Sequence, residues 1–210
     1  MNKFVYGVLA VALAGTMTIG AGYAEQQQVQ QGAPDEIAME QAMEQAMQAA
    51  TPGEKHQVLE NLVGEWNYTI SYRVSPEAPL ETSNGTSQNQ WILDGRFVQQ
   101  DVAGQMAMGE ETKLFKGMGL IGHDNLKNEY TSVWVDNMGT GTMTGEGSYD
   151  QATKVLEEEG TYTCPLKGGE VEYKSELKFV DNDHYTYTVY NTLPNGQQFK
   201  GMEIKYTRAQ

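Results

Sequence analysis

The chain has 210 residues, and 14 Lys and Arg stand against 28 Asp and Glu, which gives a formal net charge of −14 at pH 7. This acidic balance argues against nucleic acid as a partner, because nucleic-acid binding needs clustered basic residues. The single Cys excludes an intramolecular disulfide and a Cys-based zinc site. The 3 Trp, 12 Tyr and 5 Phe are enough to build an aromatic core.

Residues 1–24 have the pattern of a secretory signal peptide. Lys3 supplies a positive charge, the stretch 4–21 carries no charge, and Gly22 and Ala24 are the small residues that cleavage after Ala24 requires. Gly and Thr dilute the apolar stretch, which makes a transmembrane anchor the weaker alternative. The sequence therefore predicts a secreted protein of the bacterial periplasm, without a stable membrane anchor after signal cleavage.

Residues 25–50 form an extension that precedes the main domain. The extension begins with a Gln-rich tether of low complexity. From Pro34 onward a helix is predicted, and its Met39, Met43 and Met47 recur every four residues and so share one face. Thioethers at this spacing can bind Cu(I), but no His or Cys accompanies them. An amphipathic face that docks on the barrel or on a partner is the favoured interpretation.

The main domain, residues 51–210, begins with a short helix and continues as strands. Thr51 is expected to be the N-cap of a capping box with Glu54, and Gly64 is expected to end the helix. From Trp66 the hydrophobic period changes to two, which indicates a half-buried strand.

Nine further strands follow at short, regular intervals. They are expected near 82–93, 96–103, 113–123, 129–136, 140–149, 154–163, 170–180, 184–193 and 197–208. Turn signals separate them and no crossover helix intervenes, so consecutive strands should be antiparallel neighbours. The predicted fold class is all-β, an antiparallel up-and-down barrel of about ten strands with an N-terminal helical extension.

The last hairpin shows which side chains share a face. If Asn195 and Gly196 form a two-residue turn, three apolar pairs lie opposite each other: Val189 with Met202, Tyr187 with Ile204, and Tyr185 with Tyr206. Applied to other strands as well, this alternation predicts an aromatic interior that includes Trp66, Tyr68, Tyr72, Tyr173, Tyr187 and Tyr206. It also places the guanidinium of Arg208 on the inner face.

The same residues resemble a known group of proteins. The short helix that runs into Gly64-Glu65-Trp66, together with Arg208 on the last strand, is similar to the Gly-x-Trp and terminal-Arg pattern of calycin barrels, such as lipocalins. More specifically, the chain from Thr51 to Arg208 resembles the bacterial family "domain of unknown function 1579". The matching motifs are Pro52-Gly53-x-x-His56, Leu62-Val63-Gly64-x-Trp66, Trp91-Ile92-Leu93-x-Gly95-Arg96-Phe97, Trp134-Val135-Asp136-Asn137-Met138-Gly139, Glu146-Gly147-x-Tyr149-Asp150 and Met202-Glu203-Ile204-x-Tyr206-Thr207-Arg208. The resemblance implies barrel closure by Gly64, Trp66 and Arg208, with the Arg stacked on the Trp, and it implies little about function.

The sequence assigns no catalytic, cofactor or metal residue. His56, His123 and His184 lack the spacing of a metal site, and no nucleophile motif is present. Haem ligation by His123 or His184, as in the nitrobindin branch of the calycins, is disfavoured because strand alternation points His184 outward.

The segment Asp136-Asn137 is ambiguous. A carboxylate and an amide at the mouth of a barrel can orient a ligand or abstract a proton, while the alternative is an Asx-turn that closes a hairpin. Arg96 has a similar ambiguity after the Asp94-Gly95 turn.

The favoured function is binding of a small hydrophobic or aromatic molecule without catalysis. One alternative is an enzyme at the barrel mouth that uses Asp136 and Arg96, and another is an envelope interaction protein that docks through the Met-rich helix. The candidate ligand-binding residues are Trp66, Tyr68, Tyr72, Trp91, Arg96, Trp134, Asp136, Asn137, Tyr173, Tyr187 and Tyr206.

Overall fold

The computed structural model describes residues 36–108, 111–164, 168–193 and 195–210. The expected signal peptide (1–24) and the Gln-rich start of the extension lie outside these described residues.

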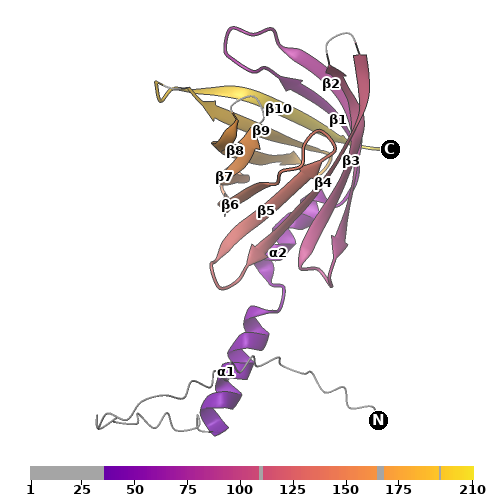
Figure 1. The fold of residues 1–210 in the computed structure, drawn as a ribbon. Coiled ribbons are helices and arrows are strands. Elements are labelled where there is room, and N and C mark those ends of the chain that lie inside the picture. The colour runs from indigo at the N-terminus through magenta and orange to yellow at the C-terminus, as the bar shows by residue number, and fades with distance from the viewer. Residues whose placement is uncertain (1–35, 109–110, 165–167, 194) are drawn as a thin grey trace, which may run out of the picture.

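A closed barrel of ten strands follows an N-terminal set of short helices (Figure 1). The helical segments are α1 (Glu36–Ala49), α2 (Glu54–Gln57) and the 3-10 helix η1 (Val58–Leu62). The strands are β1 (Gly64–Tyr72), β2 (Glu81–Ile92), β3 (Phe97–Met108), β4 (Glu111–Asp124), β5 (Glu129–Asp136), β6 (Met143–Asp150), β7 (Val155–Cys164), β8 (Gly169–Asp181), β9 (His184–Thr192) and β10 (Gln198–Arg208).

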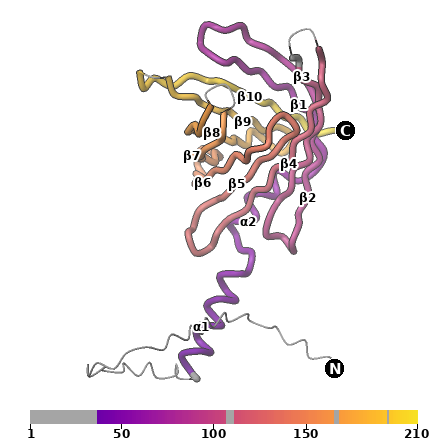
Figure 2. Tube along the Cα trace, viewed as in Figure 1, coloured from indigo at the N-terminus to yellow at the C-terminus, as the bar shows by residue number. Residues whose placement is uncertain are grey.

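Each strand pairs with the next one in an antiparallel ladder, and β10 returns to pair with β1 (Figure 2). The predicted all-β, up-and-down barrel is confirmed. Closure leaves no free sheet edge, so the backbone polar groups of β1 and β10 satisfy each other.

The barrel has two different ends. At the end where β1 begins, α2 and η1 lie across the opening, and Leu59 and Leu62 of η1 are completely buried in the core. We call this the closed end. At the opposite end, which we call the open end, the chain passes from β1 to β2 and from β3 to β4.

Gly53, rather than Thr51, is the N-cap of α2. The backbone N–H of Gly53 donates to Nδ1 of His56, 3.1 Å away, while the Thr51 hydroxyl donates back to the carbonyl of Met47, 2.7 Å away. The predicted capping box with Thr51 and Glu54 is therefore wrong, because Thr51 is engaged in ending α1.

The Met-rich face of α1 is exposed. Met39, Met43 and Met47 retain 53%, 60% and 69% of their accessible surface. The contact of α1 with the barrel is at its last turn, where the amide of Asn125 donates to the carbonyl of Ala49. Docking of the Met stripe on the barrel, one of the two expectations, is thus not observed.

The last hairpin has the predicted pairs but a different turn. The strands stop at Thr192 and resume at Gln198, and the Leu193 N–H donates to the carbonyl of Gln197 across the longer loop. A β-bulge between Lys200 and Met202 then restores the register, so that Met202, Ile204 and Tyr206 lie opposite Val189, Tyr187 and Tyr185. The two-residue turn is wrong, while the predicted inner face is confirmed.

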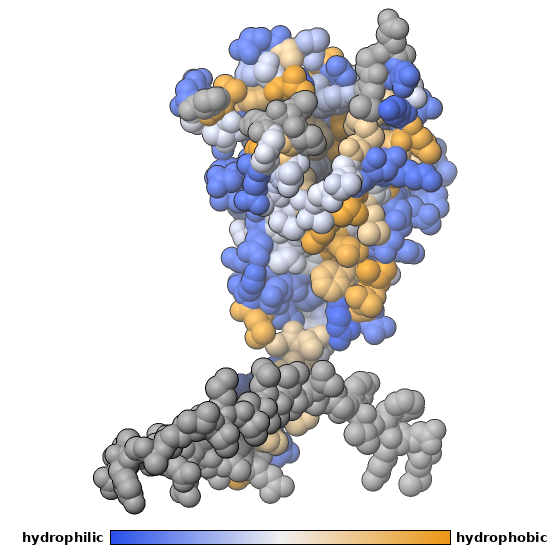
Figure 3. All heavy atoms as spheres, viewed as in Figure 1, coloured by the Kyte–Doolittle hydropathy of each residue, from blue (hydrophilic) through white to orange (hydrophobic). Residues whose placement is uncertain are grey.

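On the outer wall, apolar side chains gather over β4 and β5 (Figure 3). Cross-strand pairs Met118–Val135 and Leu120–Val133 form this stripe, and Met118 and Val133 are 40% and 41% exposed. No helix among the described residues is long and apolar enough to cross a membrane.

Candidate functional site: an aromatic cup with a buried carboxyl group

The floor of the barrel is sealed by Trp66 and Arg208. The guanidinium carbon of Arg208 lies 4.1 Å from the centre of the Trp66 ring, and the indole N–H donates to the carbonyl of Leu62 at 2.8 Å. Nη1 of Arg208 donates to the carbonyl of Val63 at 2.9 Å. Gly64 has φ +126°, and a Cβ there would overlap Nη1, so glycine is required beside the guanidinium.

Above Trp66 lies a packed layer of tyrosines. Tyr185 stands edge-on to Trp66, with ring centres 4.7 Å apart, and stacks on Tyr206 at 4.1 Å. Burial raises the pKa of both phenols. Tyr68 continues the layer, and its ring occupies the space that Gly85 leaves free on the inner face. This half of the interior is filled by the barrel's own side chains.

The open half of the interior is different, because several of its inward-facing apolar side chains are only partly buried. Five of them line what we call the cup: Ile70, Phe115, Trp134, Tyr187 and Ile204. The rings of Phe115 and Trp134 are nearly parallel, with centres 6.3 Å apart. Trp134 pairs with Gly119 of β4, and its indole lies flat over Gly117, where a Cβ would overlap the ring. Solvent therefore reaches an aromatic surface inside the barrel.

Glu158 lies at the base of the cup. It alternates with Leu156 and Gly160 on the inner face of β7, pairs with Ser175 of β8 and is only 4% exposed. The Ser175 hydroxyl donates to Oε2 over 3.5 Å, whereas Oε1 has no hydrogen-bond partner among the described residues. Burial raises the pKa of this carboxyl group, and interactions with the hydroxyls of Ser132 and Ser175 oppose the shift only in part.

Two tyrosines share this layer with the carboxyl group. Burial and the nearby charge of Glu158 raise the pKa of Tyr173 to about 12, and hydrogen bonds with Ser132 and Tyr187 act in the opposite direction. The pKa of Tyr187 is raised by burial and by Glu158 as well. The cup therefore ends on a carboxyl group surrounded by neutral hydroxyls. Such a group can accept a hydrogen bond from a ligand, or donate one when protonated.

The other predicted residues lie outside this layer. Tyr72 is at the open end of β1, where its hydroxyl donates to Glu81 at 2.7 Å, and burial followed by Glu81 raises its pKa to about 12. Trp91 is at the closed end, where its indole donates to Glu60 of η1. Trp91 therefore fastens the helix to the barrel and does not contact the cup.

Asp136 and Asn137 form the structural turn that was the alternative to a catalytic pair. Oδ2 of Asp136 accepts from the Trp134 indole and Oδ1 accepts from the backbone of Met138, each at 2.9 Å. The Asn137 side chain bridges two backbone groups of β4, the N–H of Lys116 and the carbonyl of Leu114.

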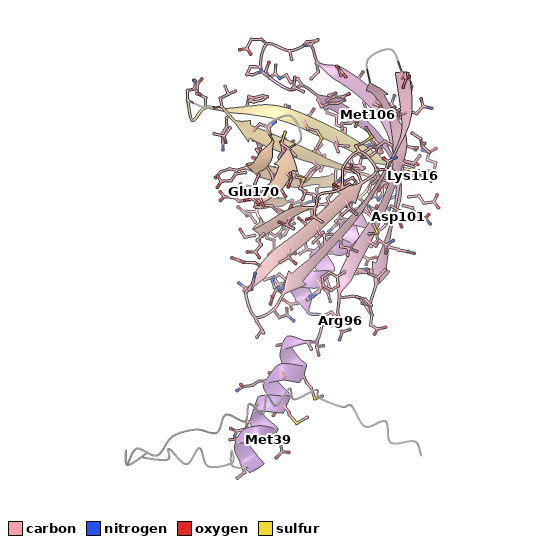
Figure 4. The ribbon with its side chains drawn as sticks, in the orientation of Figure 1. Met39, Arg96, Asp101, Met106, Lys116 and Glu170 are labelled. Atoms are coloured by element: carbon pink, nitrogen blue, oxygen red, sulfur yellow. The ribbon has the colours of Figure 1, made fainter. Side chains whose placement is uncertain are left out.

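The structure does not bring together Asp136 and Arg96, the two residues that the enzyme hypothesis combined. Asp136 pairs with Gly117 near the open end, whereas Arg96 precedes Phe97, which pairs with Gly122 near the closed end. Five residues of β4 separate the two levels, or about 17 Å at the rise of a strand. Arg96 indeed lies by the helices, far from Met106 near the other end (Figure 4).

The histidines do not face the cup. His56 and His123 pack edge to face at the closed end, and burial, followed by the charge of His123, lowers the pKa of His56. His184 is half exposed and contacts Asp181 at 2.8 Å. No cluster of three or more potential metal-ligating side chains occurs in the described part of the chain.

Sequence reasoning missed Glu158, Ser132 and Ser175. The run Glu157-Glu158-Glu159 reads as a solvated face, yet a strand period of two turns its middle member away from its neighbours. Alternation with Leu156 and Tyr162 was the signal that could have placed Glu158 inside.

Two clefts lie outside the cup. One, of about 550 Å³, runs over the outer wall of β1 to β4, where its side chains include Asp101 and Lys116 (Figure 4). The other, of about 570 Å³, lies between α1 and the closed end and includes Arg96 and His123. Neither contains a buried, unpartnered polar atom among the described residues.

The closed ten-strand barrel with its N-terminal helix defines the class of protein as calycin-like. Within that class, the chain belongs to the family described as "Protein of unknown function (DUF1579)", whose family model matches residues 51–208.

Solved structures show the same fold at low sequence identity. Rv2717c from M. tuberculosis is 12% identical, with a TM-score of 0.54, over 76% of this chain and 100% of that one. The S-type phycobiliprotein lyase CPES from Guillardia theta is 12% identical, with a TM-score of 0.51, over 74% of this chain and 93% of that one. No curated protein sequence matches the chain.

Proposed function

We propose that this protein binds a small hydrophobic or aromatic molecule in the cup and does not transform it. The observation that carries the proposal is the contrast between the two halves of the interior. Trp66 and Tyr185 are 1% exposed at the floor, while Trp134, Tyr187 and Ile204 remain partly exposed on the same inner surface. Apolar surface that stays accessible inside a closed barrel favours an apolar ligand, because binding removes it from water.

The similarity to a phycobiliprotein lyase is consistent with this proposal at the level of fold alone. We also propose that the chain acts outside the cytoplasm, since residues 1–24 have the pattern of a signal peptide. N-terminal sequencing of the protein from its own cells tests this, and a chain that still begins at Met1 would contradict it.

Filling the cup tests the proposed binding. Ile204→Trp adds an indole to the inner face between Ile70 and Tyr187, its cross-strand neighbours on β1 and β9. Lys205→Trp adds the same group at the next position of β10, which faces solvent. The probe is 1-naphthalenemethanol, and its affinity is measured by isothermal titration calorimetry. We expect the original chain and Lys205→Trp to bind it with equal affinity.

Binding to Ile204→Trp should fall at least tenfold, with circular dichroism showing an intact barrel. If the smaller Ile204→Phe is needed for folding, it should weaken binding in the same direction. Unchanged binding to a folded, filled variant, or no binding to the original chain, would contradict the proposal.

The exposed Met stripe favours a second candidate function, docking on a protein partner through α1. Met39, Met43 and Met47 cover no other described part of the chain. Met39→Glu with Met43→Glu should then abolish association with that partner and leave the unfolding midpoint of the barrel unchanged. Association that survives both substitutions would exclude this use of the helix.

A further inference from the structure

Glu158 is a buried acidic group without a counter-charge. The buried polar and charged side chains of the described residues are His56, Ser87, Asn89, His123, Glu158, Ser175 and Thr188, and none of them is Lys or Arg. The guanidinium of Arg208 lies at the floor, where it donates hydrogen bonds to the carbonyl oxygens of Val63 and Asn182. A carboxylate in such surroundings loses its hydration and gains no cation in return.

The unpartnered atom belongs to the same layer as the cup. Oε1 of Glu158 has no donor in the described part of the chain. Tyr173 and Tyr187, which interact with this carboxyl group, also interact with each other. Tyr187 lines the cup and is partly exposed, so the polar layer is adjacent to the space that a ligand would enter.

We propose that Glu158 makes the cup selective for a small apolar or aromatic amine. The protonated nitrogen donates to Oε1 of Glu158, and the apolar body lies against Phe115, Trp134 and Ile204. This inference rests on the proposed function, since it names the chemical class of the ligand for the same cup.

The alternatives are disfavoured by charge. A neutral alcohol can hydrogen-bond with Oε1 but brings no positive charge to stabilise the ionised carboxylate, and a carboxylic acid brings a second acidic group beside the first. The net charge of −14 also raises the local concentration of cations around the chain. An amine alone meets the hydrogen-bonding and the electrostatic requirement together.

Three probes with the same ring system separate these possibilities: 1-naphthylmethylamine, 1-naphthalenemethanol and 1-naphthoic acid. Calorimetric titration of the full chain at pH 7 should show the amine binding about tenfold or more tightly than the alcohol, as expected for a charged hydrogen bond, and the acid binding most weakly. Glu158→Gln should abolish the preference for the amine, because it lowers the affinity for the amine far more than the affinity for the alcohol.

Glu157→Gln is the matched control. It removes one negative charge at the adjacent position of β7, which is exposed on the outer face, so it reports the long-range effect of net charge alone. It should leave the preference for the amine intact.

A measurement on the original chain does not depend on the substitutions folding. Because burial raises the pKa of Glu158, titration of the amine in two buffers that differ in ionisation enthalpy should reveal release of protons from whatever fraction of the group is protonated in the free chain, and titration of the alcohol should not. Equal affinity of amine and alcohol, or the same loss in both variants, would overturn this inference while the proposed function stands. Failure of all three probes to bind would overturn both.

Discussion

Glu158 of β7 and Ser175 of β8 lie directly opposite each other on the inner face of the barrel, and the serine hydroxyl contacts one carboxyl oxygen while the other has no partner among the described residues. The carboxyl group lies near Tyr173 and Tyr187, and Tyr187 lines the cup. The position of the carboxyl group has consequences for stability as well as for binding.

The pH dependence of stability tests the burial of Glu158. Its pKa is raised in the folded state above the ordinary value of 4.5. Below pH 4.5 Glu158 is protonated in both the folded and the unfolded state, so it does not change the free energy of unfolding. Above pH 4.5 the group releases its proton in the unfolded chain first, which stabilises the unfolded state relative to the folded state. Stability should therefore decline as the pH rises from 4.5 through the raised pKa, when the contribution of Glu158 is isolated.

Glu158→Gln isolates that contribution, because the amide does not titrate. The variant should be more stable than the original chain at pH 7 and equally stable at pH 4, as measured by urea unfolding. Glu157→Gln should show no such pH-dependent difference. If Glu158→Gln instead lowers the stability at pH 7, the carboxylate has a favourable partner.

The floor is tested by Arg208→Lys. An ammonium cannot reproduce both the contact with Trp66 and the hydrogen bonds to the carbonyls of Val63 and Asn182. We expect a loss of about 1–3 kcal/mol in the free energy of unfolding, measured with urea. Arg96→Lys, at an exposed turn, should change it by less than about 0.5 kcal/mol. Equal effects of the two substitutions would contradict the role of the guanidinium in closure.

The packing of Trp134 is tested by Gly117→Ala. The new methyl group would overlap the indole and displace it from the wall of the cup. The expected cost is about 1–3 kcal/mol of stability, together with a shift in tryptophan fluorescence. Gly169→Ala is the control, since a Cβ there meets nothing within 4 Å. If Gly117→Ala changes neither the stability nor the fluorescence, the indole of Trp134 does not lie over Gly117.

Asp136→Asn separates a structural carboxylate from a catalytic one. The amide has one acceptor oxygen where the carboxylate satisfies two donors, the Trp134 indole and the Met138 N–H. We expect a loss of about 1 kcal/mol in stability and unchanged affinity for 1-naphthalenemethanol. A loss of affinity far beyond the loss of stability would show that Asp136 contacts the ligand after all.

Much of the fold could be predicted because period-two patterns are local. The alternation from Trp66 onward and in the last two strands, together with an assumed two-residue turn, placed Tyr187, Tyr206 and Ile204 on the inner face. The turn itself was wrong, since a bulge near Gly201 and a longer loop produce the same register as a two-residue turn. The predicted cross-strand pairs are the same for a two-residue turn and for a longer loop with a bulge, so they do not tell the two turns apart.

The candidate site could be predicted only in part, because its function depends on which end of the barrel a residue occupies. Tyr187 and Trp134 were expected among the ligand-contacting residues and line the cup, but Arg96 and Asp136 lie at opposite ends. Glu158 was hidden in an acidic run whose composition indicates solvent. Only strand parity, combined with the Ser175 pairing, shows that its carboxyl group is buried.

The indole N–H resonances of the three tryptophans provide the most direct test of binding in the cup. The chain has 3 Trp, and they lie at the floor (Trp66), beside η1 (Trp91) and in the cup (Trp134). Titration of the ¹⁵N-labelled protein with 1-naphthylmethylamine should shift the Trp134 resonance and leave those of Trp66 and Trp91 in place. A shift confined to Trp66 or Trp91, or no shift at saturating probe, would contradict a ligand site in the open half of the barrel.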